Sequence, residues 1–332
     1  MSVSNPSSNR GILARIFISP DERRFRAGWR LLLHAMLVFL ITGILVYLAL
    51  PFIQDPALLS TNTSAVGFLL ELIAILGATW LARRTLDRRS FKSLGFEWDQ
   101  FTLTDLLLGF FIPAIMMALI FLTEWALGYL TFQGFAWQYE DFSTVLRGLA
   151  SGFAAFVFVA ISEEVLSRGY HLQNITEGTN LFWGLILSST VFSILHLANP
   201  SSGLSAVTGL IAAGIFLAFG WIRTRRLWLP IGLHLGWNFF EGNIFGFQVS
   251  GLETFRLLRH SIDGPVWLTG GSFGPEAGLI ILPAMALGIW LIVIFTRGRS
   301  GISLDLFETQ KLTPPSSEPG EQAPAQDQPP SV

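Results

Sequence analysis

The chain has 332 residues, of which 51% are hydrophobic and only 13% are charged, and its formal net charge is −2. Soluble domains carry about 25% charged residues, so this composition predicts a polytopic membrane protein. The absence of cysteine excludes a disulfide framework, thiol catalysis and thiolate metal sites, which leaves histidine and carboxylate side chains as ligands for any metal. Because the near-neutral charge offers no basic surface, we expect no nucleic-acid partner.

Eight apolar runs of about 20 residues are each long enough to cross the hydrocarbon core of a membrane. Unpaired backbone polar groups cannot face lipid, so these runs must be helices. We therefore predict an all-α fold with about eight transmembrane helices, at residues 30–52, 64–82, 103–127, 147–170, 181–198, 204–222, 228–247 and 277–296.

The basic residues lie in short blocks between the apolar runs. If the spans alternate in direction, only Arg147, Arg256 and Arg259 fall on one side, and the rest of the 21 Lys and Arg residues fall on the other. The positive-inside rule then predicts that both chain termini are cytoplasmic. We expect an integral protein of a bacterial cytoplasmic membrane, with the lipid bilayer among its partners.

Three further segments complete the predicted organisation. Residues 1–29 form a cytoplasmic segment without a leader-peptide pattern, in which "RGILARIFI" (residues 10–18) fits either an interfacial helix or a frayed segment. Residues 248–276 form an extracytoplasmic loop. Residues 298–332 are rich in Pro, Ser and Gln and have little to bury, so we predict a disordered cytoplasmic tail.

The stretch "FVAISEEVLSRGYHLQN" (residues 158–174) places ionisable side chains inside an apolar run. Each such group at mid-membrane costs about 2.5 to 3.5 kcal/mol, so it needs a partner or a function. Glu164 and Arg168 stand four residues apart in the order that favours an ion pair on a helix. Glu163 points about 100° away with no cation in register. It is therefore either an interhelical hydrogen-bonding group or a carboxylate with a chemical role.

Two later helices each carry one histidine. "TVFSILHLANP" puts Phe192 and His196 on one helical face, and "PIGLHLGWNFFEGN" does the same for His234 and Asn238. A single buried histidine is usually a hydrogen-bonded core residue, and Asn238 would then only form a hydrogen bond between helices. A turn at residues 176–180 would, however, bring Glu163 and His196 to similar depth on adjacent helices, so the spacing permits contact.

Taken in order, these motifs resemble the CPBP group of intramembrane proteases, also called the CAAX prenyl endopeptidase or Abi family. The family pattern is Glu-Glu-x-x-x-Arg, then Phe-x-x-x-His, then His-x-x-x-Asn. The chain has "EEVLSR" at 163–168, "FSILH" at 192–196 and "HLGWN" at 234–238. The resemblance makes residues 145–247 a four-helix catalytic core, with three flanking helices in residues 30–144 and a last helix at 277–297. One departure is Ser167, where an aromatic residue often precedes the arginine.

The resemblance implies hydrolysis of a peptide bond inside the membrane, in a membrane-embedded or lipidated polypeptide. Glu163 would activate water with His196 as its partner, while His234 and Asn238 would stabilise the oxyanion and Arg168 would hold Glu164. Such roles suit these side chains, because a carboxylate can accept a proton from water and donors in a dry cleft stabilise an oxyanion. Glu163, His196 and His234 are also the ligand types of a catalytic zinc site, so metal-dependent and metal-free mechanisms both remain open.

A strict count of alternating spans raises a difficulty of depth. It places His196 near the external end of its helix and His234 near the cytoplasmic end of its own, where the two cannot meet. We therefore predict that "NPSSG" (residues 199–203) does not reach the far surface but breaks the bundle inside an aqueous cavity, as non-helical backbone can when it lines one.

Other classes of function remain open alongside the protease. "GLSA" (residues 203–206) is a near match to the Gly-x-Ser-Gly loop of a serine protease, with Ser205 as nucleophile. A transporter would explain scattered ionisable groups, and a non-catalytic scaffold or immunity protein could use the same fold. For His34, Glu71, Glu124 and Glu241 we expect interhelical hydrogen bonding or an interfacial position.

Overall fold

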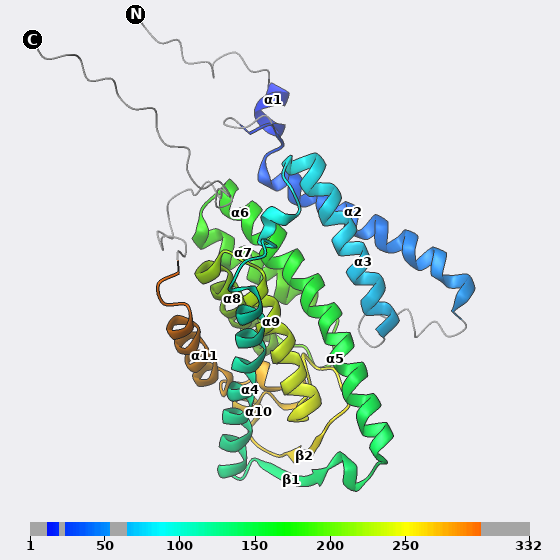
Figure 1. Cartoon of the computed structure of the whole chain (residues 1–332), viewed down its shortest axis with the longest axis vertical. Coiled ribbons are helices and arrows are strands. Elements are labelled where there is room, and N and C mark those ends of the chain that lie inside the picture. Colours follow the sequence, from blue (N-terminus) through cyan, green and yellow to red (C-terminus); the bar gives the residue numbers. More distant parts are fainter. Residues whose placement is uncertain (1–11, 20–23, 54–64, 300–332) are drawn as a thin grey trace, which may run out of the picture.

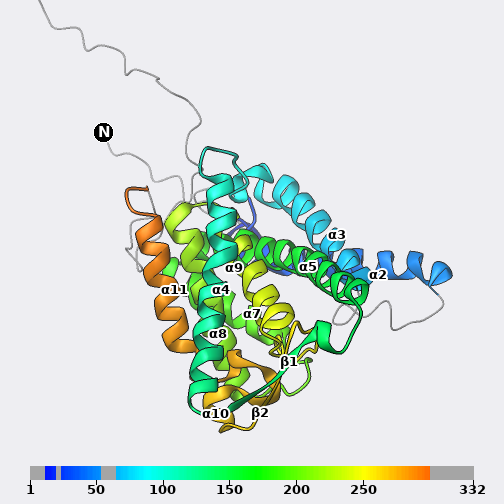
Figure 2. The same cartoon turned by 60° about the horizontal axis from the view of Figure 1, so that its bottom comes forward.

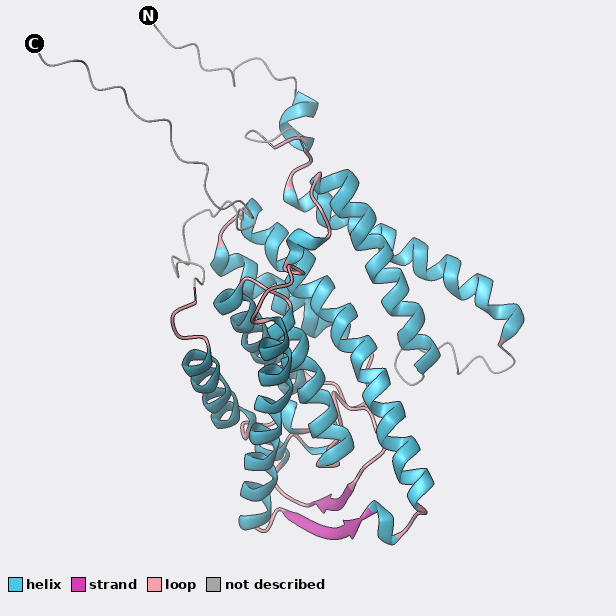
Figure 3. Cartoon of the chain, in the orientation of Figure 1, coloured by secondary structure: helices cyan, strands magenta, loops and turns pink. Residues whose placement is uncertain are grey.

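The computed structural model describes residues 12–19, 24–53 and 65–299. It is mostly helical, and Figures 1 and 3 show the helices as one bundle with two strands at one end. The predicted tail at 298–332 and much of the segment 1–29 lie outside the described residues. Within the described part of 1–29, a short helix α1 spans Ile12–Phe17.

Helices occupy all eight predicted ranges. The first four long ones are α2 (Ala27–Ala49), α3 (Ala65–Ala82), α4 (Thr102–Ala126) and α5 (Phe142–Glu164). After α5 the chain continues through a π-helical segment (Val165–His171) into α6 (Leu172–Gly178). The remaining helices are α7 (Leu181–Leu195), α8 (Leu204–Thr224), α9 (Trp228–Asn238) with a π-helical extension (Phe239–Ile244), α10 (Val266–Thr269) and α11 (Ile281–Phe295).

Five of these helical stretches in the described residues are long and apolar enough to cross a membrane, and α7 and α11 are shorter apolar helices. Large apolar side chains such as Phe39 on α2 and Phe111 on α4 are exposed. Exposed apolar surface of this extent is expected where helices face lipid. The prediction of an integral, polytopic membrane protein is confirmed.

The all-α prediction missed a small sheet. Strands β1 (Leu130–Phe135) and β2 (Leu258–Ile262) pair antiparallel, and a bulge interrupts the register between Phe132 and Gly134. Both strands lie outside the predicted spans, at the end of the bundle where α4 ends and α5 begins (Figure 1). The two-stranded sheet closes this end because β2 belongs to the long 248–276 segment, which folds back against β1.

Local signals start the helices that carry the site. The Asp141 side chain caps α5 by accepting a hydrogen bond from the backbone N–H of Thr144, and the Asn180 side chain caps α7 in the same way through Trp183. Hydrogen bonds from the Ser143 and Thr144 side chains hold the pKa of Asp141 below its usual range. A break falls within the turn predicted at 176–180, but only at residues 179–180, because α6 continues to Gly178 and α7 begins at Leu181.

The helices form two groups. Figures 1 and 2 show α2 and α3 to one side of the other helices, with α3 against α5. The main core lies among α4, α8, α9 and α11, and includes Met116, Phe216, Leu233 and Ile281. Helix α9 is therefore surrounded by protein, which fixes the orientation of its polar residues.

Glycines on α9 allow α4 to approach it at backbone distance. A Cβ atom on Gly236 would lie 2.1 Å from the carbonyl oxygen of Phe110, and one on Gly232 would lie 2.5 Å from that of Leu106. Small residues four apart are the usual means of close helix packing in membranes. His234 lies between these two glycines, so the α4–α9 contact also positions the imidazole.

We expect Gly236→Ala to destabilise the protein by about 1 to 3 kcal/mol, because the added methyl group forces the α4 and α9 backbones apart. The measurement is the thermal unfolding midpoint of the purified chain in detergent. Gly77→Ala on α3 is the matched control, since a Cβ atom there meets nothing within 4 Å. Equal midpoints for the two variants would contradict the close contact.

Candidate functional site

The structure brings Glu163, His196 and His234 together from three helical regions. Glu163 lies in the last turn of α5, His196 directly follows α7, and His234 lies within α9. The Nε2 atoms of His196 and His234 are 3.9 and 3.8 Å from the same oxygen of Glu163, Oε2. All three side chains are largely buried. The contact that the spacing permitted is therefore present.

Hydrogen bonds on the other ring nitrogens orient the two imidazoles. His196 Nδ1 lies 2.8 Å from the carbonyl oxygen of Phe192, and His234 Nδ1 lies 2.8 Å from Oε1 of Glu164. A carbonyl or carboxylate oxygen can only accept, so each Nδ1 carries a proton and donates it. Both rings consequently direct Nε2 towards Glu163.

Glu164 and Arg168 form the predicted ion pair, fully buried. Arg168 Nη1 donates to Glu164 Oε1 at 2.6 Å, and Nη2 donates to the carbonyl oxygen of Gly214 on α8 at 3.0 Å. The guanidinium also lies over the ring of Phe192, 4.6 Å from its centroid. Arg168 thus joins α8 and α7 to the carboxylate that orients His234.

The helix that carries these residues widens at the site. Residues 165–171 are π-helical, and π-helical turns inside α-helices occur frequently at functional sites. Arg168 therefore reaches Glu164 from a wider turn than the regular i to i+4 geometry assumed from the sequence. No residue pattern in this stretch signals the change.

Asn238 is placed one turn beyond His234 on α9 and is buried. Among the described residues, no hydrogen bond joins its amide to Glu163 or to either imidazole. Asn238 stands on the same face of α9 as His234, four residues further along the helix.

The count of alternating spans was wrong to place His196 and His234 at opposite depths, because both imidazoles lie within 4 Å of Glu163. Helix α7 has 15 residues and is about 22 Å long, less than the roughly 30 Å of a hydrocarbon core. The turn after it is partly covered by protein, since Asn199 is buried and its side chain donates to the Ser250 carbonyl oxygen at 3.0 Å. The short α7 agrees with the prediction that residues 199–203 do not reach the far surface of the membrane. The depth of this turn in the bilayer stays a prediction.

The sequence left open whether Glu163, His196 and His234 bind a divalent metal such as zinc. Tetrahedral zinc ligands lie about 3.4 Å from one another, whereas the imidazole nitrogens are 3.8 and 3.9 Å from Glu163 Oε2. Among the described residues, no group of three His, Asp or Glu side chains is arranged to hold a metal ion. In this arrangement Glu163, His196 and His234 do not fit zinc.

Comparison with known proteins finds a family likeness in the same region. Residues 145–240 match the Rce1-like family, described as type II CAAX prenyl endopeptidase Rce1-like. These residues form a CAAX prenyl endopeptidase-like segment. The resemblance stated from the three motifs is confirmed, and the matched range holds Glu163, Glu164, Arg168, His196, His234 and Asn238.

A curated relative agrees with this CAAX prenyl endopeptidase-like assignment. The chain is 35% identical over 80 residues to "Putative membrane peptidase YdiL" of Bacillus subtilis (strain 168), an alignment that covers 24% of this chain and 31% of that protein. The chain thus spans less than a third of the length of this relative. A membrane peptidase family is indicated, and substrate and mechanism are matters for proposal.

Several contacts around the CAAX prenyl endopeptidase-like segment had no signal in the sequence. The bond from His234 to Glu164 joins residues 70 positions apart. Glu276, outside the matched range, accepts a hydrogen bond from Trp237, the neighbour of Asn238. Sequence reasoning passed over Glu276 because it stands singly at the start of the last apolar run.

His34, Glu124 and Glu241 fall outside this cluster, whereas Glu71 on α3 lies close enough to Glu163 for the two carboxylates to repel each other. His34 on α2 bonds Thr79 on α3 at 3.0 Å and stacks on Tyr170, as expected for an interhelical contact. Glu124 and Glu241 are buried, and neither carboxylate has a hydrogen-bond partner among the described residues. Ser205 is exposed at the start of α8, and no hydrogen bond joins its hydroxyl to a described histidine.

Proposed function

We propose that the protein is an intramembrane endopeptidase that hydrolyses a peptide bond in a membrane-embedded or lipidated polypeptide. The observation that supports this proposal best is the convergence of both imidazole Nε2 atoms on one oxygen of Glu163. A general base and the hydrogen-bond donors for an oxyanion must lie around one point if they are to act on the same carbonyl group. A prenylated substrate agrees with the family description and is part of the proposal.

In the proposed mechanism, Glu163 acts as general base. A water molecule held about 2.8 Å from Glu163 Oε2 is within reach of the neighbouring imidazoles. Glu163 takes one proton from this water as the water oxygen attacks the carbonyl carbon, and a tetrahedral oxyanion forms. When the C–N bond breaks, the carboxyl group returns the proton to the leaving amine nitrogen.

His196 assists Glu163 at the attacking water in this proposal, and His234 and Asn238 stabilise the oxyanion. Donation from Nε2 requires an imidazolium, since each Nδ1 proton is already engaged by Phe192 or Glu164. The Glu164 carboxylate lies against His234 Nδ1, where it orients the ring and compensates such a charge. Arg168 in turn keeps Glu164 in place.

Comparison of new N- and C-termini in membranes tests the proposal without a guessed substrate. Cells would carry either the wild-type chain or Glu163→Gln at matched expression. We expect fragments that occur only with the wild type, and these also identify the substrate. Identical fragments, with Glu163→Gln still supporting the cellular phenotype, would favour a non-catalytic scaffold or immunity protein of this fold.

A further inference from the structure

Glu276 connects the two elements that carry the site histidines. It lies in a short turn (Pro275–Ala277) before α11 and is buried. Its Oε1 accepts from Trp237 Nε1 at 3.1 Å, and its Oε2 accepts from the backbone N–H and hydroxyl of Ser250 at 2.7 and 2.6 Å. The carboxylate thus satisfies three donors from two separate segments.

Both segments lead directly to the site. Trp237 lies on α9 between His234 and Asn238. The Ser250 carbonyl oxygen accepts from the Asn199 side chain, and the backbone N–H of Asn199 donates to the carbonyl oxygen of His196 at 3.0 Å. A chain of hydrogen bonds therefore runs from α9 through Glu276 and Ser250 to His196.

The connection is fixed at both ends. Ser250 has φ of 48°, a left-handed conformation that is uncommon for a residue other than glycine, and its bonds to Glu276 hold it there. A Cβ atom on Gly209 would meet the Glu276 carbonyl oxygen at 1.7 Å, so α8 packs directly on this turn. Neither end can shift without moving a helix.

We infer that Glu276 is a positioning residue that sets the distance between His196 and His234 around Glu163. The inference rests on the proposed function and extends it to a residue outside the family-matched range. Glu276 does not touch the reacting atoms. It holds α9 and the turn after α7 in register, so that both imidazoles reach one carboxylate oxygen.

Glu276→Gln tests this role, because an amide group has a single acceptor oxygen and cannot accept from both Ser250 and Trp237 Nε1. We expect kcat for the substrate found by the fragment comparison to fall by about 10- to 100-fold, as displacements near 1 Å can cause, with KM little changed. Trp237→Phe, which removes one donor and keeps an aromatic ring, should lower kcat less. Glu253→Gln, an exposed carboxylate in the same segment, is the matched control.

A second measurement does not depend on cleavage. In the full chain labelled with [15N]histidine, Glu276→Gln should shift the ring signals of His196 and His234 and leave that of His34 unchanged. Unchanged His196 and His234 signals together with wild-type kcat in Glu276→Gln and Trp237→Phe would overturn the inference. Wild-type cleavage by Glu163→Gln would instead refute the proposed function and leave the positioning result standing.

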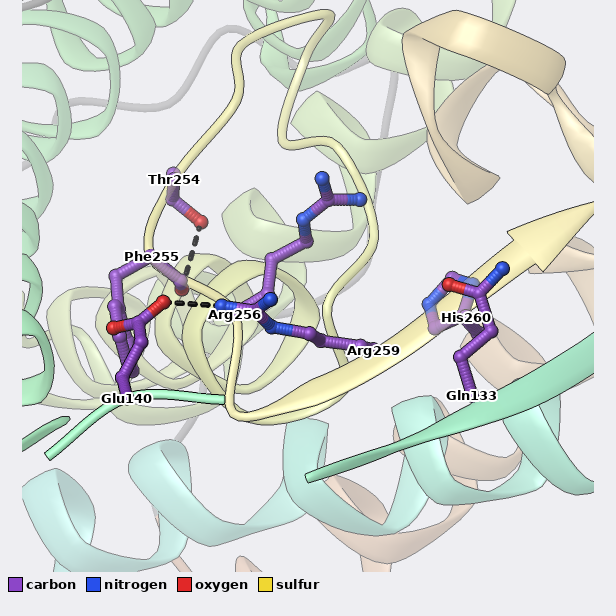
Figure 4. A pocket seen from close by; sticks show the side chains of 7 residues that line it. All are labelled: Gln133, Glu140, Thr254, Phe255, Arg256, Arg259 and His260. Atoms are coloured by element: carbon purple, nitrogen blue, oxygen red, sulfur yellow. Dashed lines mark hydrogen bonds and ion pairs between the residues drawn. The ribbon is translucent and has the colours of Figure 1, made fainter. Parts of the chain in front are cut away.

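A different observation concerns the end of the bundle near the sheet. A pocket of about 390 Å³ lies between β1 and the segment 254–260, and none of the predicted site residues lines it (Figure 4). Arg259 pairs with Glu140 and lies over the ring of Tyr139. Arg256 points away from that pair in Figure 4 and forms no ion pair with a described residue.

The surroundings of this pocket match the headgroup layer of a membrane. Tyr139, whose ring contacts the lining residue Arg259, is exposed, and so are Trp137 and Phe142 in the same stretch of sequence, where α5 begins. Trp and Tyr collect at this depth in membrane proteins. Burial lowers the pKa of His260 to about 4, so at neutral pH the two arginines and Glu140 leave one positive charge in the lining.

We propose that this pocket binds the phosphate group of a phospholipid headgroup, with Arg256 as its main ligand. A guanidinium offers two parallel N–H groups to phosphate oxygens, and Arg256 is available for such a contact. Gln133 and Thr254, which also line the pocket, can donate further hydrogen bonds to phosphate oxygens.

The test measures the thermal unfolding midpoint of the full chain in detergent with short-chain phosphatidylglycerol or with diacylglycerol of the same acyl chains. Only the phosphatidylglycerol should raise the midpoint. Arg256→Gln should lose most of this shift, Arg256→Lys should lose part of it, and Arg147→Gln, an exposed arginine at the same end, should keep it. An equal shift with inorganic phosphate would show that the pocket binds a soluble anion rather than a lipid headgroup. An unchanged shift in both Arg256 variants would overturn the proposal that Arg256 binds the phosphate.

Discussion

Glu163→Gln is expected to lower the rate of peptide-bond cleavage by about 10²- to 10⁴-fold, the range that a general base contributes. Glutamine has nearly the shape of glutamate but cannot take a proton from water. The partly buried position of Glu163 and the two imidazoles beside it should remain, so the loss should appear in kcat rather than in stability. The measurement is single-turnover cleavage by purified protein of the substrate found in membranes.

Glu124→Gln is the matched control for this prediction. Glu124 is also a buried membrane glutamate, lies on α4, and has no hydrogen-bond partner among the described residues. The Glu124→Gln variant should cleave the substrate at close to the wild-type rate. The same assay after treatment with a chelator measures any metal requirement separately, and a Glu163→Gln rate within a few-fold of wild type would exclude Glu163 as the base.

The sequence predicted the helices because the bilayer demands them. About 20 apolar residues in a run leave few alternatives in lipid, so all eight ranges contain helices. The bounds were less secure, since apolarity continues past the ends of α7 and α9 while the backbone turns or widens there. The strands β1 and β2 are short, and their paired residues lie 123 to 132 positions apart along the chain, which no local pattern reveals.

The candidate site was predictable as a set of side chains but not as a geometry. Glu163, His196 and His234 stood out because ionisable groups are costly in apolar helices. The depth of His196 depended on where α7 ends, and the orientation of His234 depended on Glu164, 70 residues away. Glu276 carried no motif at all, since its role arises only from the folding of the 248–276 segment under the site.

Arg168→Met is expected to destabilise the protein by about 3 to 5 kcal/mol, because it leaves the Glu164 carboxylate buried without its cation. Glu164 is fully buried, and its Oε1 accepts from both Arg168 and His234. The variant also removes the bond to Gly214 on α8 and the contact with Phe192. The unfolding midpoint in detergent measures the loss, with Arg147→Met as an exposed control.

The double variant Glu164→Leu/Arg168→Met separates stability from function. Replacing both members of a buried ion pair by apolar side chains is often neutral or stabilising, so most of the lost stability should return. His234 would then lack the carboxylate that orients its ring, and cleavage should remain low. A double variant as unstable as Arg168→Met would show that the other contacts of Arg168 dominate. One that regained full activity would contradict the role proposed for Glu164, because the pair would then serve the fold alone.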